Sequence, residues 1–209
     1  MVSHLVWDMD GTLIDSTGVV PDALADAIAE IGGQRPDPVE VVAAYSLGTP
    51  EVILEHFLGR ALTGDEAGVY YRLLAGAVVD PYPGILPTLE ALVGLGLPVV
   101  VFTGTTCRAA HALLGPAGIH PSLVVGGDQV PAKPAPDGLL RVAAELGIEP
   151  SAIGYIGDAN VDLRAAHAAG ATALAAGWGH LHDPAEPAHA VLSHPSQALE
   201  LLTGRRAGC

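Results

Sequence analysis

The chain has 209 residues, of which 50% are hydrophobic and 15% are charged, so it is long enough for one sizeable domain and too apolar to be disordered. Its formal net charge of −14 disfavours nucleic acid and anionic membranes as partners. The two cysteines lie far apart, no apolar run reaches about 18 residues, and charge arrives too early for a signal peptide, so we expect a cytoplasmic protein without disulfides.

The first predicted strand is His4–Trp7, and it leads into the sequence DMDGT. From residue 17 to about residue 80 the apolar residues instead recur at helical spacing, as in PDALADAIAEI and PEVILEHFL. Prolines and glycines divide this stretch into about four helices. It therefore reads as a helical insert, over residues 17–81, between the first strand and the rest of the chain.

Beyond the insert, short apolar runs alternate with helical patterns, which indicates right-handed crossovers and a parallel sheet. The predicted strands are Pro98–Phe102, Ser122–Val125, Ile153–Ile156, Ala171–Ala175 and Ala188–Leu192. The predicted helices are Ile85–Leu95, Thr106–Leu114, Asp137–Leu146, Val161–Ala169 and Ser196–Leu202. The predicted fold class is α/β, with a doubly wound parallel sheet built from residues 1–16 and 82–209. The tail GRRAGC is expected to fray.

Asp8 and Asp10 follow the first strand, where open α/β sheets bind ligands. Their side chains point the same way if the strand continues that far. Two carboxylates this close repel each other unless a cation or a shared proton intervenes, and Mg²⁺ favours such oxygen ligands. The alternative is an ordinary Asp-Gly turn.

Two further segments offer groups for an anion. Thr103 and Gly104 end the second strand with a hydroxyl and free backbone N–H groups. Lys133, the one lysine of the chain, lies in the proline-rich loop PAKPAP, which holds it more rigidly than a surface lysine needs. The alternatives are a small-residue turn and a solvated loop lysine.

Asp158 ends the strand of GYIGDANVD, and Asp162 lies in the first turn of the next helix. Taken singly, Asp158 could be a helix N-cap or a turn residue, and Asp162 could simply complement the helix dipole. Taken together, four strand ends carry Asp/Asp, Thr, Lys and Asp/Asp, and in a parallel sheet those ends converge on one edge. The residues therefore predict a phosphate and metal site.

The chain resembles the haloacid dehalogenase-like hydrolase superfamily. DMDGT, the TG after VVVF, the lysine of AKPAP and GDANVD match its four motifs, and they span nearly the whole chain. The insert looks like the small helical cap of that superfamily, and SLGTP, with Gly48 and Thr49, resembles the substrate-facing loop of the cap. PYPG, GGDQVPAKPAP and GDANVDLRAAHAAG are most similar to the phosphoglycolate phosphatase branch.

This resemblance implies a Mg²⁺-dependent phosphatase in which Asp8 attacks phosphorus and forms an aspartyl-phosphate. Asp10 would act as general acid and base, and its backbone carbonyl would bind the metal with Asp8 and Asp158. Thr103, Gly104 and Lys133 would hold the phosphoryl oxygens. Asp162 would orient Lys133 or the metal shell.

Three departures from the family pattern concern the substrate. Gly104 replaces an asparagine, the segment between GGD and KP is about one residue short, and the loop after Gly48 lacks the Arg or Lys with which relatives bind anionic substrates. The expected partner is a small phosphorylated metabolite, phosphoglycolate-like or a sugar phosphate, and the protein is expected to be a monomer or homodimer.

Two other functions compete with this one: a sugar phosphomutase, and a catalytically silent binding protein on the same fold. A mutase needs Arg or Lys side chains in the cap to hold a second phosphate, and the sequence has none beside Gly48. The complete set of motif residues disfavours a silent protein. His180 and His182 are interpreted as residues of a loop near the sheet edge, and Cys107 as the start of a helix.

Overall fold

A six-stranded sheet of order β3-β2-β1-β4-β5-β6, with every neighbouring pair parallel, forms the centre of the computed structural model. The structure describes residues 1–202, apart from the side chain of Ser46. The strands are β1 His4–Trp7, β2 Val100–Phe102, β3 Leu123–Val125, β4 Ile153–Gly157, β5 Thr172–Ala176 and β6 Ala190–Leu192. All six predicted strands are present, and the fold class is confirmed.

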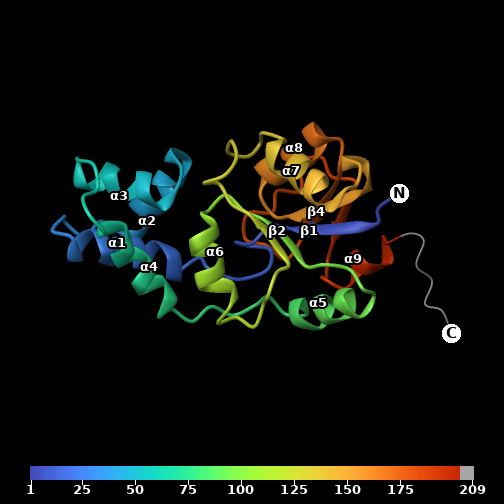
Figure 1. Cartoon of the computed structure of the whole chain (residues 1–209), viewed down its shortest axis with the longest axis horizontal. Helices are drawn as coiled ribbons and strands as arrows, with labels where there is room; N and C mark the ends of the chain where they lie inside the picture. Colours follow the sequence, from blue (N-terminus) through green and yellow to red (C-terminus); the bar gives the residue numbers. More distant parts are fainter. Residues whose placement is uncertain (203–209) are drawn as a thin grey trace.

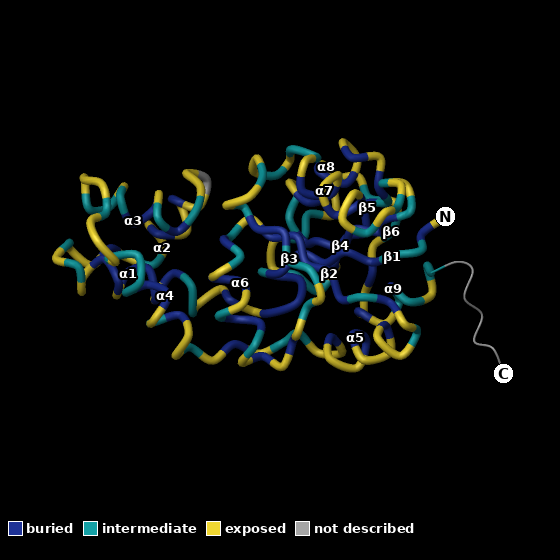
Figure 2. Tube along the Cα trace, in the orientation of Figure 1, coloured by how far each residue is buried: buried dark blue, intermediate teal, exposed yellow. Residues whose placement is uncertain are grey.

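Helices cover both faces of the sheet, as Figure 1 shows for α5 and α9 on one side and α7 and α8 on the other. The core helices are α5 Ile85–Gly94, α6 Cys107–Leu114, α7 Asp137–Leu146, α8 Asn160–Ala169 and α9 Gln197–Glu200, with the short 3-10 helix η2 at Pro150–Ala152. Side chains alternate along β1, so Leu5 and Trp7 pack with α5 and α6, whereas Val6 packs with α7 and α8. Figure 2 shows the central strands β1, β2, β4 and β5 largely buried between helices whose outer faces are exposed.

A lobe of helices extends from the core between β1 and α5 (Figure 1). We call it the helical lobe, and it contains α1 Val19–Glu30, α2 Pro38–Ala43, the 3-10 helix η1 Ala44–Leu47, α3 Pro50–Leu58 and α4 Glu66–Ala75. Helix α1 contacts α2, α3 and α4, and α4 also contacts α6 of the core. The helix starts follow local chemistry: Asp37 and Glu40 form a capping box at α2, and Pro50 opens α3.

The predicted elements differ from the structure by at most two residues at their ends. Strand β2 begins at Val100 instead of Pro98, because proline has no N–H for the ladder. Strand β6 begins at Ala190 instead of Ala188, and the ring of His189 accepts the Ala173 N–H at 2.9 Å, where a strand carbonyl would otherwise bind. The predicted tail at residues 204–209 lies outside the described residues.

None of the helices within residues 1–202 combines the length and the apolar character needed to cross a lipid bilayer.

Gly138 provides a stability test of the packing between α7 and β2. A Cβ at this position would lie 2.2 Å from two atoms of the Phe102 ring. We expect Gly138→Ala to destabilise the fold by about 1–3 kcal/mol through overpacking, and to lower Tm by about 2–4 °C for each kcal/mol. Thermal unfolding followed by circular dichroism measures this.

Gly94→Ala is the matched control, because Gly94 lies in α5 and a Cβ there meets no atom within 4 Å. This variant should keep or raise Tm through better helix propensity. Equal Tm values for the two variants would contradict the packing argument.

Candidate active site

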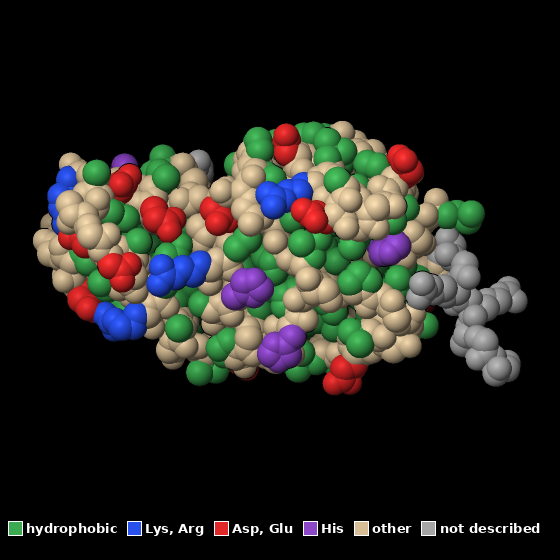
Figure 3. All heavy atoms as spheres, viewed as in Figure 1, with side chains coloured by type: hydrophobic (Ala, Val, Ile, Leu, Met, Phe, Trp, Pro, Cys, Tyr) green, Lys and Arg blue, Asp and Glu red, His purple; other side chains and the backbone are tan. Residues whose placement is uncertain are grey.

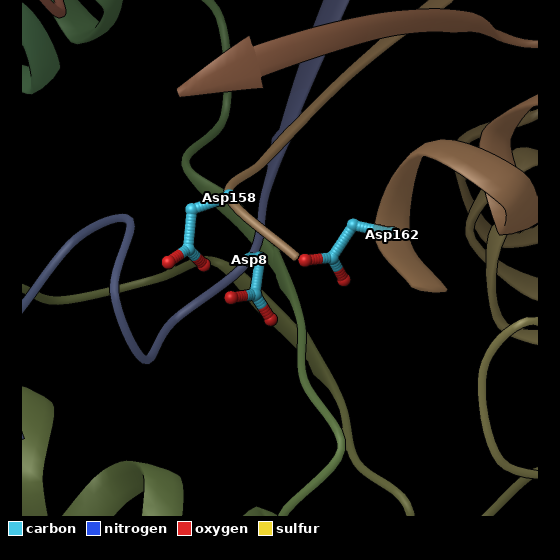
Figure 4. Close-up of side chains that lie close together, drawn as sticks. All are labelled: Asp8, Asp158 and Asp162. Carbon is cyan, nitrogen blue, oxygen red and sulfur yellow. The ribbon is translucent and has the colours of Figure 1, made fainter. Parts of the chain in front are cut away.

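The candidate active site lies at the carboxyl ends of β1, β2 and β4, which are neighbours in the sheet. Asp8 follows β1 and extends its ladder by one bond, from its N–H to Ile156 O at 2.8 Å. Thr103 follows β2, and Asp158 follows β4. Figure 4 shows the carboxylates of Asp8, Asp158 and Asp162 turned toward one another from β1, β4 and α8. The sheet therefore brings together residues that are up to 154 positions apart in the chain (162 − 8).

Lys133 lies between two of these carboxylates. Its Nζ donates to Asp8 Oδ1 and to Asp162 Oδ1, each at 2.6 Å. The three side chains are 7%, 7% and 2% exposed, so both ion pairs are shielded from water. Losing one partner of a buried ion pair typically costs about 3–5 kcal/mol. The loop lysine is thus buried in the site instead of solvated.

Asp162 is held from several directions. Its Oδ2 accepts the Ala159 N–H at 3.0 Å, and its Oδ1 accepts Lys133 Nζ. The Tyr155 hydroxyl oxygen lies 3.2 Å from the same Oδ1. Sequence reasoning did not single out Tyr155, which lies in the apolar strand β4. The available signal was a hydroxyl in a strand that is buried throughout.

Asp158 has one satisfied and one unsatisfied oxygen. Its Oδ2 accepts the Leu181 N–H at 2.9 Å, whereas its buried Oδ1 has no hydrogen-bond partner. His180 belongs to the same loop, and its Nδ1 lies 3.8 Å from Asp158 Oδ2. Gly179 allows this approach, because a Cβ there would lie 2.2 Å from the Cβ of Asp158. The loop that contains His180 and Leu181 therefore contacts Asp158 at the edge of the sheet.

Strand β1 ends at Trp7, so it does not continue as far as Asp10. The chain turns after Asp10 through Gly11, which has a φ of 82°. The Asp10 carboxylate accepts a hydrogen bond from the buried hydroxyl of Ser16. Sequence reasoning did not single out Ser16, which precedes the helical lobe.

The turn after β2 carries the predicted phosphate-binding groups. Thr103 is buried, its N–H donates to Val125 O at 3.0 Å, and its hydroxyl accepts the Thr105 N–H at 3.3 Å. Gly104 is exposed, and a Cβ there would meet no atom within 4 Å. The glycine in place of asparagine is therefore not required by packing.

Gly48 and Thr49 lie in the helical lobe, at the end of η1 and the N-terminus of α3. No hydrogen bond or ion pair found in residues 1–202 joins them to the carboxylates. A contact between lobe and core forms instead at Tyr71, whose hydroxyl bonds Glu51 and lies 2.9 Å from Thr106 Oγ1. The Arg108 guanidinium lies 4.1 Å from the centre of the Tyr71 ring. This contact ties α3 and α4 to the N-cap of α6.

Burial changes the pKa values of the charged groups in the site. Desolvation raises the pKa of Asp8, Asp10 and Asp158, and Asp162 raises the pKa of Asp8 further while Lys133 lowers it. Burial would lower the pKa of Lys133, but Asp162 and Asp8 raise it above its usual value, so the ammonium stays charged. The site thus contains four carboxylates, and Lys133 pairs with two of them, Asp8 and Asp162.

The residues present fit a divalent cation. Asp8, Asp158 and Asp162 each place an oxygen within 4.8 Å of the others. Carboxylate oxygens are the ligands that Mg²⁺ prefers, and the buried Asp158 Oδ1 lacks any other partner. The predicted ligand set of Asp8, Asp10 and Asp158 shares two members with this group. The Asp10 side chain instead contacts Ser16, so its predicted contribution through the backbone carbonyl stays a prediction.

Comparisons with known proteins agree with this architecture. The family model of haloacid dehalogenase-like hydrolases matches residues 2–170. Over 199 residues the chain is 35% identical to the phosphoglycolate phosphatase of Neisseria gonorrhoeae, which covers 86% of this chain and 81% of that protein. It is 29% identical over 231 residues to the N-acetylmuramic acid 6-phosphate phosphatase of Pseudomonas aeruginosa, which covers 98% and 96%. The crystal structure of CbbY from Rhodobacter sphaeroides in complex with phosphate has a TM-score of 0.77 at 22% identity and covers 94% and 96%.

The chain belongs to the haloacid dehalogenase-like hydrolase family, because the family model covers most of its length, including every motif that forms the site. Within the family it falls in the phosphoglycolate phosphatase-like branch, and it is a phosphatase, a hydrolase of phosphoric monoesters. The resemblance inferred from the four motifs is thereby confirmed.

Metal binding can be tested without substrate. We expect millimolar Mg²⁺ to raise Tm of the parent protein, since a ligand at 100 times its Kd stabilises the native state by about 2.7 kcal/mol. Asp158→Asn should lose most of this rise, because the substitution removes a charged oxygen from the proposed ligand set. Differential scanning calorimetry with and without Mg²⁺ measures both.

Glu145→Gln on the exposed surface of α7 changes the net charge equally and should keep the full Mg²⁺ response. A Mg²⁺ response that is unchanged in Asp158→Asn would remove Asp158 from the ligand set.

Proposed function

We propose that this phosphatase hydrolyses a small phosphomonoester with Mg²⁺ and an aspartyl-phosphate formed on Asp8. The observation that carries the proposal is the buried Lys133, which pairs with Asp8 and Asp162 beside the unsatisfied oxygen of Asp158. A nucleophilic carboxylate, a cation for phosphoryl oxygens and a metal-ligating carboxylate are the parts that phosphoryl transfer requires.

Asp8 is the proposed nucleophile. Burial and Asp162 raise the pKa of Asp8, whereas the Lys133 ammonium lowers it and so acts toward the ionised form that attacks phosphorus. A carboxylate oxygen of Asp8 forms the bond to phosphorus as the bond to the leaving oxygen breaks. The Thr103 hydroxyl, the Gly104 N–H and Lys133 would hold the phosphoryl oxygens during this transfer.

Asp10 is the proposed general acid and base. Burial raises its pKa, which favours the protonated form that can donate to the leaving alkoxide. In the second half of the reaction, Asp10 accepts a proton from water as the water oxygen bonds to phosphorus and the Asp8–phosphorus bond breaks. The Ser16 hydroxyl holds the Asp10 carboxylate in place.

Magnesium would be held by Asp8, Asp158 and the Asp10 carbonyl, with Asp162 supporting, and it would supply positive charge beside the phosphoryl oxygens. The orphaned Asp158 oxygen and the excess of buried carboxylates support this assignment.

We propose that residues 17–81 act as a cap that excludes bulk water and selects the leaving group, with Gly48 and Thr49 facing substrate. The contact of Tyr71 with Thr106 supports this role, because it holds the helical lobe against the turn of Thr103 and Gly104. Figure 3 shows a notch between the helical lobe and the core on one side of the molecule.

The favoured substrates are phosphoglycolate-like compounds or sugar phosphates, in keeping with the phosphoglycolate phosphatases among the relatives. A phosphomutase would need lobe cations for a second phosphate. The arginines of the helical lobe, Arg35, Arg60 and Arg72, are each paired with an acidic residue of the same lobe, which disfavours that function. Figure 3 shows such opposite charges gathered on the lobe.

We also propose that the protein is cytoplasmic. The net charge of −14 disfavours nucleic acid and anionic membranes as partners. The proposed oligomeric state of the protein is a monomer or homodimer.

The nucleophile can be tested with p-nitrophenyl phosphate and Mg²⁺. Asp8→Asn should lower kcat by about a thousandfold or more, because it removes the group that forms the covalent bond. Phosphate release under saturating substrate measures the change.

Asp22→Asn on the exposed face of α1 is the control, and it should retain parental kcat. Turnover of Asp8→Asn at the parental rate would exclude Asp8 as nucleophile.

The substrate class can be tested with a panel of phosphorylated metabolites that includes 2-phosphoglycolate and sugar phosphates. We expect stoichiometric release of inorganic phosphate, because water completes the reaction at Asp8. Phosphorus NMR distinguishes release from isomerisation. Isomerisation of bisphosphorylated sugars without phosphate release would favour the mutase instead.

A further inference from the structure

Tyr155 lies at the centre of the site without a place in the reaction described above. It belongs to β4, and its side chain is fully buried. Its hydroxyl donates to Phe102 O at 2.9 Å and lies 3.2 Å from Asp162 Oδ1. One side chain thus joins the last residue of β2 to the first turn of α8, across the intervening strand β1.

Both ends of this link are next to groups that handle phosphate in the proposed function. Phe102 immediately precedes Thr103 and Gly104, so its carbonyl sets where their turn begins. Asp162 Oδ1 is the same oxygen that accepts Lys133 Nζ at 2.6 Å. A displacement of this oxygen therefore moves the ammonium with it.

The aromatic rings add a second constraint on the ammonium. Lys133 Nζ lies 5.0 Å from the centre of the Phe102 ring and 5.5 Å from the centre of the Tyr155 ring. The two rings are 5.6 Å apart and inclined by 34°. A cation within about 6 Å of an aromatic ring is attracted to its face. The ammonium is therefore bound by two carboxylates and lies close to two rings.

We propose that Tyr155 is a positioning residue, which acts through Asp162 and the Phe102 carbonyl to fix Lys133 relative to the turn of Thr103 and Gly104. This role rests on the proposed function, in which Lys133 holds a phosphoryl oxygen. Tyr155 touches no reacting atom. It sets the distance between two phosphate-binding groups that come from different strands.

The competing explanation is that the Tyr155 hydroxyl only satisfies a buried carbonyl and stabilises the core. The two explanations differ in what the hydroxyl controls. A structural hydroxyl changes Tm alone, whereas a positioning hydroxyl changes the environment of Lys133 and the rate of the chemical step.

Tyr155→Phe separates them, because it removes the hydroxyl and keeps the ring. Lys133 is the one lysine in the sequence, so protein grown with ¹⁵N- and ¹³C-labelled lysine gives a single side-chain ammonium signal by NMR. We expect this signal to shift and to exchange faster with water in Tyr155→Phe. We also expect kcat with p-nitrophenyl phosphate to fall about tenfold, with KM within about twofold, as for the loss of other outer-shell partners.

Val142→Ala is the matched control, because Val142 is buried in the same cluster as Tyr155 and Phe102 but carries no polar atom. It should lower Tm and leave both the Lys133 signal and kcat at their parental values. An unchanged Lys133 signal in Tyr155→Phe overturns the proposal, and so does an equal shift of that signal in both variants. An unchanged kcat in Tyr155→Phe of an active parent also overturns it.

The NMR measurement requires no turnover, so it also separates this inference from the proposed function. A parent protein without phosphatase activity would refute the proposed function, whereas the Lys133 signal would still decide whether Tyr155 positions the ammonium.

Discussion

The buried ammonium of Lys133 is the interaction on which the site depends. It donates to the carboxylates of Asp8, which follows β1, and Asp162, which lies in α8, and these are 154 residues apart (162 − 8). Within residues 1–202, it is the one lysine or arginine side chain that pairs with either of them. Without it, burial would leave adjacent carboxylates in mutual repulsion. The Lys133 ammonium offsets the repulsion between the buried carboxylates. In the proposed function the same ammonium binds a phosphoryl oxygen, so one residue serves both the fold and the chemistry.

The strand order explains why such a cluster can form. Because β1 lies between β2 and β4, the end of β1 places Asp8 between the turn of Thr103 and the carboxylate of Asp158. Parallel pairing sends all three ends to the same edge. Tyr155 and Phe102 then meet across β1 and lie close to the ammonium. The strand order and the packing of the buried rings therefore help to set the distances between the polar groups of the site.

Most elements of this fold were predictable because each has a local cause. The strand His4–Trp7 and the helix Asp137–Leu146 match their predicted ranges, since a short apolar run marks the first and helical periodicity marks the second. Of the ends that differ, the start of β2 reflects the local Pro98, whereas the start of β6 adjoins a contact between remote residues, in which the His189 ring accepts the Ala173 N–H. Among the residues of the candidate site, those in the four motifs could be singled out from the sequence, whereas Tyr155 and Ser16 were not. A hydroxyl by itself does not indicate which distant carboxylate it will lie beside.

The sequence by itself determined the parallel α/β core, the helical insert and the edge at which the polar residues meet, because periodicity and strand-end chemistry are local properties. Only the tertiary structure decided which side chains at that edge pair with one another. It separated Asp8, paired with Lys133, from Asp10, bonded to Ser16, and it joined Asp162 to the same lysine. These pairings depend on the relative positions of β1, β4, α8 and the lysine loop, and such positions are set by packing between elements that are remote in the chain.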